Sequence, residues 1–543
     1  MTMLEWVLLI AAVTLLNVSL TFANVWPTLG IRLTGHASLE AVIFVLGLVL
    51  ARHWMGPRSQ ATLRALAALW VVLIVGRYID VTGSSLYGRD VNLYWDSRHL
   101  PSVSAMFASV APWRTAAVLL GFLLLPVVLY APMRWAFGRV SSSADDRRAG
   151  PVLGVVAGVV LAVYLAQSGG ARLPARLVFA EPMIPVYARE LGELGYEMSG
   201  AGVAELGPAP PIGSDLARVQ GADVFLIFVE SYGAVAWGVP EYVSALTESR
   251  ARLETDIRDT GRGVVSAFVE STTFGGESWL AHISLLSGTE VRDDRTNVRL
   301  MAQERDTLVK LFGRHGYRTV AITPGLLLDW PEGAFYGFDE IYDYRRLGYQ
   351  GPPFGWWSIT DQFALARVDR LEIEPMPRDP AFVFFSTLST HAPFTPAPPY
   401  QPDWQRVLSA TPYDRDELDR AWSWQPDWLN LGPSYVEALR YIQATIGGYL
   451  RMRADRDLVM ILVGDHQPPS LVSGEGASWD VPVHVIASRP AVLERLRRHR
   501  FTEGFVPEGP AIARMDTLLP LLLDAFGEEA SAPATPPAPV SVP

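Results

Sequence analysis

The 543-residue chain contains no cysteine. Disulfides, thiol nucleophiles and zinc sites with cysteine ligands are therefore excluded, and any exported domain must be held by its hydrophobic core alone. Lysine is almost absent as well, because Lys310 is the only one and the other basic residues are arginines. We attribute this bias to genome composition rather than to function. The formal net charge of −11 argues against a nucleic-acid partner, which would need a basic surface.

Long apolar runs are confined to the first 170 residues, although half of the whole chain is hydrophobic. Five segments reach or approach the roughly 20 residues that cross a bilayer. We therefore predict an α-helical membrane domain over residues 1–170, with five spans near 4–24, 37–53, 62–80, 113–135 and 150–168. The first segment is too long, and too soon followed by another span, to be a cleaved signal peptide.

The arginines between these segments predict the orientation of the membrane domain. The loops after the second and fourth spans carry Arg52, Arg58, Arg64, Arg134, Arg139, Arg147 and Arg148. Both loops should be cytoplasmic, which puts the N-terminus inside and the large C-terminal part outside. Asn17 and Ser19 interrupt the first span, so a four-span alternative stays open. An external loop over 77–112 is rich in charges and aromatics, which either anchor at headgroup level, bind a lipid headgroup or dock the exported domain.

Short apolar stretches alternate with amphipathic ones over residues 221–530, after a linker over 171–220. The predicted strands are 223–229, 264–269, 318–322, 381–386, 458–463 and 481–486. The predicted helices include 241–259, 278–287, 305–315 and 435–451. This alternation predicts an α/β domain with a mostly parallel sheet and helices on both faces. Residues 392–434 predict an irregular insertion, and the Pro/Ala-rich end over 531–543 predicts a disordered tail.

Polar side chains follow several of these strands, at the edge where open α/β sheets bind ligands. Asp465 and His466 follow one strand, Glu230 follows another, and His391 lies a few residues beyond a third. Each residue alone has an ordinary structural explanation, such as a helix cap or a loop position. Together, carboxylates and an imidazole at one sheet edge predict a site for a single zinc- or manganese-like ion.

A glycine pair followed by Ser278 suggests a nucleophile. Gly275 and Gly276 allow a tight turn, and Ser278 then falls in the first turn of a helix, whose free N–H groups favour a developing alkoxide. A divalent cation nearby would supply the acidity that a serine hydroxyl lacks near neutral pH. His391 would then stabilise a phosphoryl oxygen or protonate a leaving group. An ordinary N-cap serine is the alternative explanation for Ser278.

Four motifs resemble those of the membrane-anchored branch of the alkaline phosphatase/sulfatase superfamily, which includes lipoteichoic acid synthases and phosphoethanolamine and phosphoglycerol transferases. Phe228-Val-Glu-Ser231 resembles the first metal-ligand motif, and Val463-Gly-Asp-His466 resembles the second. Ser389-Thr-His-Ala-Pro393 is similar to the substrate-site histidine motif. Ser278 has the family's spacing to the apolar end of the following helix, which closes at Gly288.

The resemblance implies a metal-dependent enzyme of a bacterial inner membrane, with an alkaline phosphatase-like catalytic domain outside the cytoplasm. It would move a phosphoethanolamine- or phosphoglycerol-type group from a phospholipid donor to a glycan or lipid acceptor, through a covalent phospho-serine. One Zn²⁺ or Mn²⁺ would be held by Glu230, Ser278, Asp465 and His466. Ser278 and His391 would be the catalytic residues, and His391 would also bind the substrate.

The chain departs from the family pattern in ways that leave alternatives open. Most relatives use a threonine nucleophile, so Thr272 and Thr273 are rivals of Ser278. A classical sulfatase would have proline and arginine where this chain has Leu280 and His282, and His282 becomes a further candidate for substrate binding. These departures favour a phosphoryl transferase. A sulfatase or phosphodiesterase that uses water as its acceptor is the first alternative, and a non-enzymatic membrane scaffold is the second.

Overall fold

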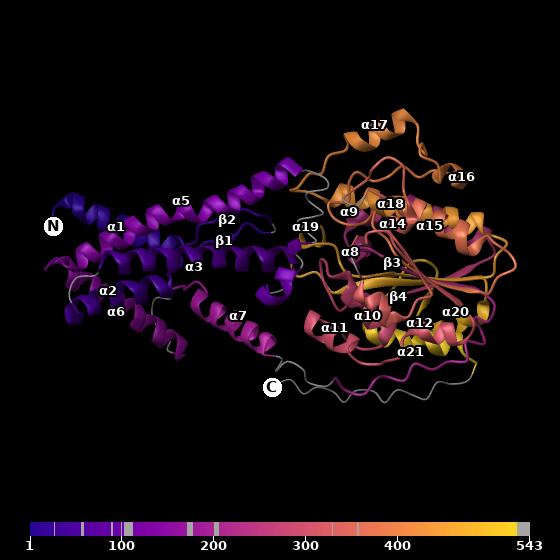
Figure 1. Ribbon diagram of the computed structural model, residues 1–543, viewed down its shortest axis with the longest axis horizontal. Helices are drawn as coiled ribbons and strands as arrows, with labels where there is room; N and C mark the ends of the chain where they lie inside the picture. Colours follow the sequence, from indigo (N-terminus) through magenta and orange to yellow (C-terminus); the bar gives the residue numbers. More distant parts are fainter. Residues whose placement is uncertain are drawn as a thin grey trace. The chain divides into compact units, whose positions relative to one another are not determined.

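The structure, a computed structural model, describes residues 1–528 apart from 27, 56–58, 88–90, 99, 102–111, 171–176, 200–205, 328–329 and 356–357. The predicted tail over 531–543 therefore lies outside the described residues. The chain divides into two structural units, Met1–Gly202 and Val203–Pro543. Figure 1 traces the path of the chain through both units.

The N-terminal unit is built of helices. They occupy all five predicted spans, as α1 (Met3–Val18), α2 (Leu39–Met55), α3 (Gln60–Tyr87), α5 (Pro112–Ala144) and α6 (Ala149–Ser168). Three stretches within the described residues are long and apolar enough to cross a membrane, namely Gln60–Ser85, Leu119–Ala144 and Ala149–Ser168. The prediction of five spans is therefore confirmed only in part, because α1 and α2 have 16 and 17 residues.

The first predicted span ends early because Asn17 holds the chain in a turn. Its Nδ2 donates to the His36 carbonyl oxygen at 2.9 Å, and its Oδ1 accepts from the Ser38 N–H at 2.8 Å. The chain between these residues forms a short hairpin of β1 (Ala23–Asn24) and β2 (Ile31–Arg32). Asn17 thus joins the end of α1 to the start of α2.

Helix α7 (Met183–Met198) lies in the predicted linker but belongs to the N-terminal unit. The Tyr187 hydroxyl donates to the Val72 carbonyl oxygen on α3 at 2.7 Å. The predicted external loop also contacts α7, because Asn92 Nδ2 donates to Glu193 Oε2 at 2.7 Å. This part of the linker is therefore an ordered helix that packs within its own unit.

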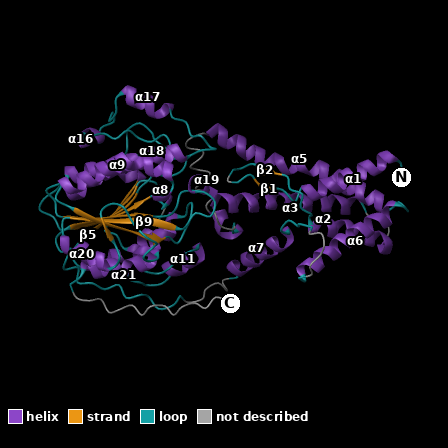
Figure 2. Cartoon of the chain, turned by 180° about the vertical axis from the view of Figure 1, so that it is seen from behind, coloured by secondary structure: helices purple, strands orange, loops and turns teal. Residues whose placement is uncertain are grey.

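The second unit is built on an eight-stranded sheet with the strand order β10-β4-β9-β8-β3-β7-β5-β6, shown in orange in Figure 2. The strands are β3 (Asp223–Val229), β4 (Gly263–Glu270), β5 (Arg318–Thr323), β6 (Glu340–Asp343), β7 (Ala381–Ser386), β8 (Leu458–Gly464), β9 (Asp480–Ala487) and β10 (Thr502–Glu503). Central β3 is parallel to both β7 and β8. The predicted mostly parallel sheet is confirmed, with β9 and β10 antiparallel to their neighbours.

Helices cover both faces of this sheet, which explains why its strands are continuous apolar runs. Every residue of β3 and β8 is buried. One face packs against α10 (Ser278–Ser287), α12 (Leu308–Arg314), α20 (Pro490–Arg498) and α21 (Met515–Phe526). The other packs against α9 (Pro240–Asp259), α15 (Asp361–Val368) and α18 (Gly432–Met452). Figure 1 shows these two helical layers above and below the strands.

Short helices complete the unit. They are α8 (Val235–Gly238), α11 (Asp294–Met301), α13 (Pro331–Tyr336), α14 (Tyr344–Leu347), the π-helix η1 (Asp369–Ile373), α16 (Trp404–Val407), α17 (Arg415–Ser423) and α19 (Ser470–Ser473). Two of them, α16 and α17, lie in the predicted irregular insertion, which is therefore more ordered than expected. Helix α12 begins later than predicted because Thr307 caps it, accepting a hydrogen bond from the Lys310 N–H at 3.2 Å.

Strand β9 carries a buried histidine, His484, whose polar atoms are both satisfied. Its Nδ1 lies 2.8 Å from Ser266 Oγ, and its Nε2 lies 3.1 Å from the Tyr232 hydroxyl. The ring stacks on Phe505 with the centroids 4.1 Å apart. Burial lowers the pKa of His484 to about 3, because a charged imidazole would lose its hydration in this core.

We expect the α/β unit to lose stability on mild acidification because of His484. In the unfolded chain a histidine binds a proton below its ordinary pKa of 6.5, whereas folded His484 stays neutral down to about pH 3. Stability is therefore lost as the pH falls through this window, by about 2 kcal/mol at pH 5. Thermal unfolding of the wild type and of His484→Gln between pH 7.5 and 5 measures the effect. The wild type should lose more stability than the variant, and equal losses would contradict this account.

Candidate active site

The carboxyl ends of β3 and β8 bring Glu230, Asp465 and His466 together. One ligand atom from each side chain lies within 4.8 Å of the other two. His466 Nε2 lies 3.4 Å from Glu230 Oε1 and 3.8 Å from Asp465 Oδ1, and all three side chains are buried. The strand register explains the meeting, since Val229 pairs with Gly464 and the next residues of both strands leave the sheet side by side.

The donor atoms of this cluster fit a divalent metal ion. Asp465 Oδ1 accepts hydrogen bonds from the N–H groups of Ser231 and His466 at 2.8 and 2.7 Å. Asp465 Oδ2 is buried and has no hydrogen-bond partner within the described part of the chain. His466 Nδ1 donates to the Gln467 carbonyl oxygen at 2.7 Å, which leaves Nε2 as the ring nitrogen that faces the carboxylates and would bind a metal. An unpaired carboxylate oxygen and an oriented imidazole are what Zn²⁺ or Mn²⁺ would bind.

The pKa shifts of the three clustered residues also favour a bound cation. Burial raises the pKa of Asp465, and the neighbouring charge of Glu230 raises it further. Burial opposes the ionisation of Glu230 as well, but the charge and hydrogen bond of His466 outweigh burial and lower its pKa. Burial lowers the pKa of His466, yet the charges of Asp465 and Glu230 outweigh it and raise this pKa to about 9. Two buried carboxylates thus compete for one positive charge, and a bound cation relieves that competition.

Ser278 places its hydroxyl against this cluster. Its Oγ donates to Glu230 Oε2 at 2.9 Å and lies 3.2 Å from His466 Nε2. The three residues before it have φ values of 70°, 156° and 62°. The first two are glycines, for which such angles carry little strain, whereas the third is Glu277. This turn brings the first residue of α10 to the ends of β3 and β8.

The rival hydroxyls lie in the same loop but make other contacts. Thr273 Oγ1 donates to the Gly276 carbonyl oxygen at 2.6 Å. Thr272 Oγ1 accepts a hydrogen bond from Ser284 Oγ at 3.5 Å. Both threonines are buried. Their positions favour a structural role in the loop and leave Ser278 as the candidate whose hydroxyl bonds to the cluster.

The loops that carry these residues are joined by hydrogen bonds of the protein itself. The Gly275 N–H donates to the Gln467 carbonyl oxygen at 3.1 Å. The Ser271 hydroxyl donates to the main-chain carbonyl oxygen of Asp465. With the bond from the Ser231 N–H to Asp465 Oδ1, these contacts tie together the loops that follow β3, β4 and β8.

His391 lies in the loop that follows β7, and a buried aspartate accepts hydrogen bonds from the main chain of this loop. Asp361, the first residue of α15, accepts hydrogen bonds from the N–H groups of Leu388 and Ser389 at 2.7 and 2.8 Å. His391 is half-buried, and its Nδ1 lies 2.7 Å from the Ala392 carbonyl oxygen. A positive charge on His391 lowers the pKa of Glu230, so this side chain lies within electrostatic reach of the cluster.

The sequence pattern does not mark Asp361 as a site residue. Burial raises its pKa to about 6, although the hydrogen bonds from the His391 loop act against this rise. The sequence offers one signal, since Thr360-Asp361 is a typical helix start. Nothing local shows that this helix start faces the loop after β7.

We expect Asp361→Asn to lower turnover about 10- to 100-fold without changing metal content. An amide of the same shape keeps one acceptor but turns its NH₂ group toward the second loop N–H, which displaces His391. The measurement is kcat on a chromogenic phosphodiester, with metal content determined by mass spectrometry. Asp369→Asn is the matched control, because it breaks a buried ion pair with Arg453 and should cost stability but not turnover. Equal kcat losses in both variants would show that Asp361 acts only through stability.

The structure places His282 in the hydrophobic core. Its ring centroid lies 4.3 Å from that of Phe228 and 5.4 Å from that of Phe384. Burial lowers the pKa of His282 to about 3 despite the nearby charge of Glu230. Its Nε2 is buried and finds no hydrogen-bond partner among the described residues. This environment favours a position in the core beneath the cluster over a contact with the substrate.

Residues 223–484 match the family model named Sulfatase. No curated protein matches the chain.

Several solved structures are similar to this chain at low sequence identity. An alkaline phosphatase superfamily protein from Vibrio parahaemolyticus is 16% identical with a TM-score of 0.37, covering 62% of this chain and 75% of that one. The lipoteichoic acid synthase LtaP from Listeria monocytogenes is 15% identical with a TM-score of 0.34, covering 54% and 71%. The periplasmic domain of phosphoethanolamine transferase EptC from Campylobacter jejuni is 11% identical with a TM-score of 0.35, covering 58% and 96%.

Proposed function

We propose that this protein is a metal-dependent phosphotransferase that works through a covalent phospho-serine. The observation that carries the proposal is the hydrogen bond from Ser278 Oγ to Glu230 within a buried cluster that includes Asp465 and His466. These four residues would hold one Zn²⁺ or Mn²⁺. When bound, the ion supplies positive charge that lowers the pKa of the serine hydroxyl.

The residues of the site account for both steps of the transfer, which are formation of the phospho-serine and its attack by the acceptor. Glu230 Oε2, 2.9 Å from Ser278 Oγ, is placed to accept the serine proton. Ser278 Oγ attacks the phosphorus of the donor, the phosphorus–oxygen bond to the diacylglycerol breaks, and that oxygen takes a proton from His391. An acceptor hydroxyl then attacks the phospho-serine and gives its proton to His391. The bond from phosphorus to Ser278 Oγ breaks, and Ser278 Oγ takes back its proton from Glu230. The positive end of the α10 dipole lies at Ser278 and favours the phosphoryl charge.

We further propose that the five N-terminal helices anchor the enzyme in a bacterial inner membrane, with the catalytic domain on the outer side. Three helices of sufficient length and apolarity support the anchor, and the arginine-rich loops support the orientation. The donor would be a phospholipid with a phosphoethanolamine- or phosphoglycerol-type headgroup, and the acceptor a glycan or lipid hydroxyl. A donor that stays in the bilayer suits an enzyme tethered to it.

A hydrolase is the second candidate, and the match to the sulfatase family favours it. It would use the same serine and the same metal ligands but transfer the group to water. A sulfatase or a phosphodiesterase would then release a free headgroup or sulfate and modify no macromolecule.

Mass spectrometry of the full chain after incubation with phospholipid vesicles tests the proposal. We expect an added headgroup mass on the Ser271–Ser278 peptide, assigned to Ser278, together with released diacylglycerol. Labelled headgroup that appears only in soluble form would identify the hydrolase. A metal-loaded wild type that forms no adduct and releases no product would contradict enzymatic activity and favour a scaffold.

A further inference from the structure

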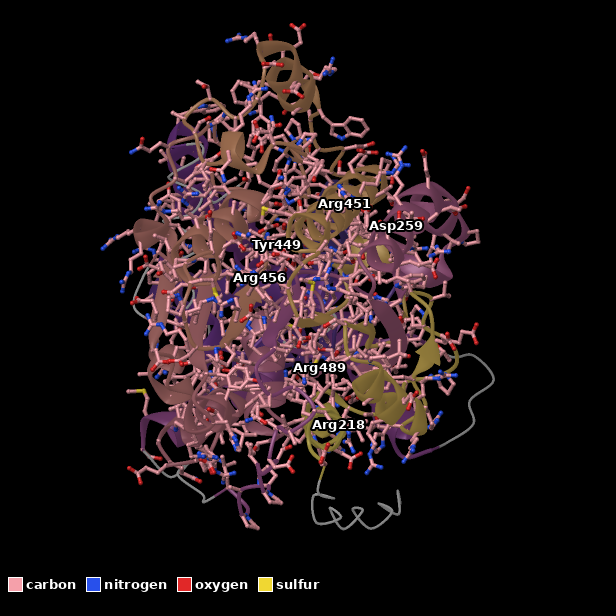
Figure 3. All side chains as sticks on the ribbon, turned by 90° about the vertical axis from the view of Figure 1, so that its right-hand side faces the viewer. Arg218, Asp259, Tyr449, Arg451, Arg456 and Arg489 are labelled. Atoms are coloured by element: carbon pink, nitrogen blue, oxygen red, sulfur yellow. The ribbon has the colours of Figure 1, made fainter. Side chains whose placement is uncertain are left out.

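A groove on the α/β unit runs along α18 and has a volume of about 990 Å³. Helices α9, α17 and α18 and the loop over 394–400 line it. Figure 3 shows Arg451 of α18 and Asp259, the last residue of α9, on the same face of this unit. The volume suits a ligand larger than a lipid headgroup.

The groove begins beside the candidate active site. Phe394 and Thr395 line both the groove and a small pocket that His391 also lines. From there the lining residues follow α18 from Ser434 to Arg451, which at about 1.5 Å per residue is a path of roughly 25 Å. A ligand in the groove would therefore be elongated, with one end near His391.

A buried amide in this groove lacks an acceptor. Gln443 of α18 is 5% exposed, and its Oε1 accepts a hydrogen bond from Ser249 Oγ at 2.6 Å. Its Nε2 is buried and meets no hydrogen-bond partner within the described ranges. Leaving such an NH₂ group unpaired costs about 1–3 kcal/mol. Both residues line the groove, so a ligand oxygen there would satisfy the amide.

Two aromatic rings form firm walls of the groove. Trp424 is 47% exposed, yet its Nε1 donates to Ser434 Oγ at 3.1 Å and its carbonyl oxygen accepts from Thr395 Oγ1 at 3.0 Å. Tyr400 lies against α18 because Gly448 has no side chain, since a Cβ there would lie 2.0 Å from the tyrosine hydroxyl. The aromatic surfaces are thus fixed before any ligand arrives.

The charges that line the groove cancel, since four acidic and four basic side chains contribute to it. Three ion pairs are formed among them, Arg252 with Glu248, Arg440 with Glu437, and Arg451 with Asp256. A polyanion would need a surplus of positive charge, and a lipid chain would need an apolar lining. Paired guanidinium and carboxylate groups instead offer donors and acceptors at once.

From these features we propose that the groove binds a neutral oligosaccharide, the glycan acceptor of the transferase proposed above, on which this inference rests. A sugar ring has an apolar C–H face that packs on aromatic rings, and its hydroxyls both donate and accept hydrogen bonds. At the end near His391, a bond forms between a sugar hydroxyl and the phosphoryl group as the bond to Ser278 Oγ breaks. The hydroxyl proton passes to His391, and Glu230 returns the serine proton to Ser278 Oγ.

Binding of neutral hexasaccharides to the full chain in lipid nanodiscs tests the proposal. Glucose hexamers with α-1,4, β-1,2, β-1,3 and β-1,4 linkages are compared by saturation-transfer NMR and tryptophan fluorescence. We expect at least one to bind, and Trp424→Ala and Gln443→Leu to weaken it about tenfold each. Trp428→Ala is the matched control, because this tryptophan is 58% exposed in the same segment but does not line the groove.

The possible results distinguish a failure of the groove assignment from a failure of the proposed transferase function. Groove variants that form the Ser278 adduct at the wild-type rate but transfer it slowly to a bound hexasaccharide support both proposals. If an oligosaccharide binds through Trp424 and no adduct ever forms, the proposed function fails and the groove assignment stands. If the adduct forms while no neutral hexasaccharide binds, or Trp428→Ala weakens binding as much as Trp424→Ala, the groove assignment is overturned. Preference for an anionic glycan overturns it too.

Discussion

Ser278→Ala should abolish adduct formation and lower transfer by at least about ten thousand-fold. The loss is this large because the phosphoryl group has no other covalent carrier once the hydroxyl is removed, while Glu230 Oε2 loses its hydrogen-bond partner. Headgroup release from labelled phospholipid vesicles measures the rate, and mass spectrometry measures the adduct. The variant should keep the wild-type fold, since the change removes a single oxygen atom from the first turn of α10.

The neighbouring threonines supply the controls. Thr272→Val and Thr273→Val keep the side-chain shape and remove only the hydroxyl, so we expect each to retain activity within about tenfold. Thr273→Val should be the less active of the two variants, because it loses the hydrogen bond to the Gly276 carbonyl oxygen that shapes the turn. If Thr273→Val lost the adduct while Ser278→Ala kept it, the nucleophile would be the threonine.

Asp465→Asn should remove the metal while preserving the fold, with a loss of activity of about a thousandfold or more. An asparagine Oδ1 still accepts the N–H groups of Ser231 and His466. Its NH₂ group, however, replaces Oδ2, the buried oxygen that has no partner in the described structure. A donor group there repels a cation, so metal per chain should fall from near one to near zero.

Thermal unfolding with and without a chelator completes this test. A ligand present at a thousand times its Kd adds about 4 kcal/mol of stability, so the wild type should unfold at a lower temperature in chelator. Asp465→Asn should be insensitive to chelator and at least as stable as the chelated wild type, because it removes one of two buried carboxylates that repel each other. A variant that retains metal at the wild-type ratio would refute the assignment of Asp465 as a ligand.

Much of the α/β unit could be predicted because strands that are buried on both faces of a sheet appear in the sequence as continuous apolar runs. The strands at 223–229 and 381–386 and the helix at 278–287 agree with β3, β7 and α10 at both ends. The direction of β9 could not be predicted, because a strand buried on both faces reads the same whether its neighbours are parallel or antiparallel. The strands β6 and β10, with four and two residues, are too short to show a pattern.

The three residues of the cluster could be predicted from the sequence, but the residues packed around them could not. Glu230, Asp465 and His466 each end an apolar strand, and the carboxyl ends of neighbouring parallel strands meet at one edge. The role of Asp361 depends on a contact across 27 positions of sequence, which no local pattern reveals. The aromatic surroundings of His282 on α10 could not be predicted either, because they come from two phenylalanines on β3 and β7.

The hydrogen bonds between the loops after β3, β4 and β8 have a consequence for how the proposed ion would be acquired. Because Ser231, Ser271 and Gly275 hold these loops through main-chain and carboxylate contacts, the polypeptide can reach its native shape first and be metallated afterwards. Under the proposal of one Zn²⁺ or Mn²⁺, folding itself would then not select the metal. The occupant would be the suitable cation that is most available where the finished domain resides.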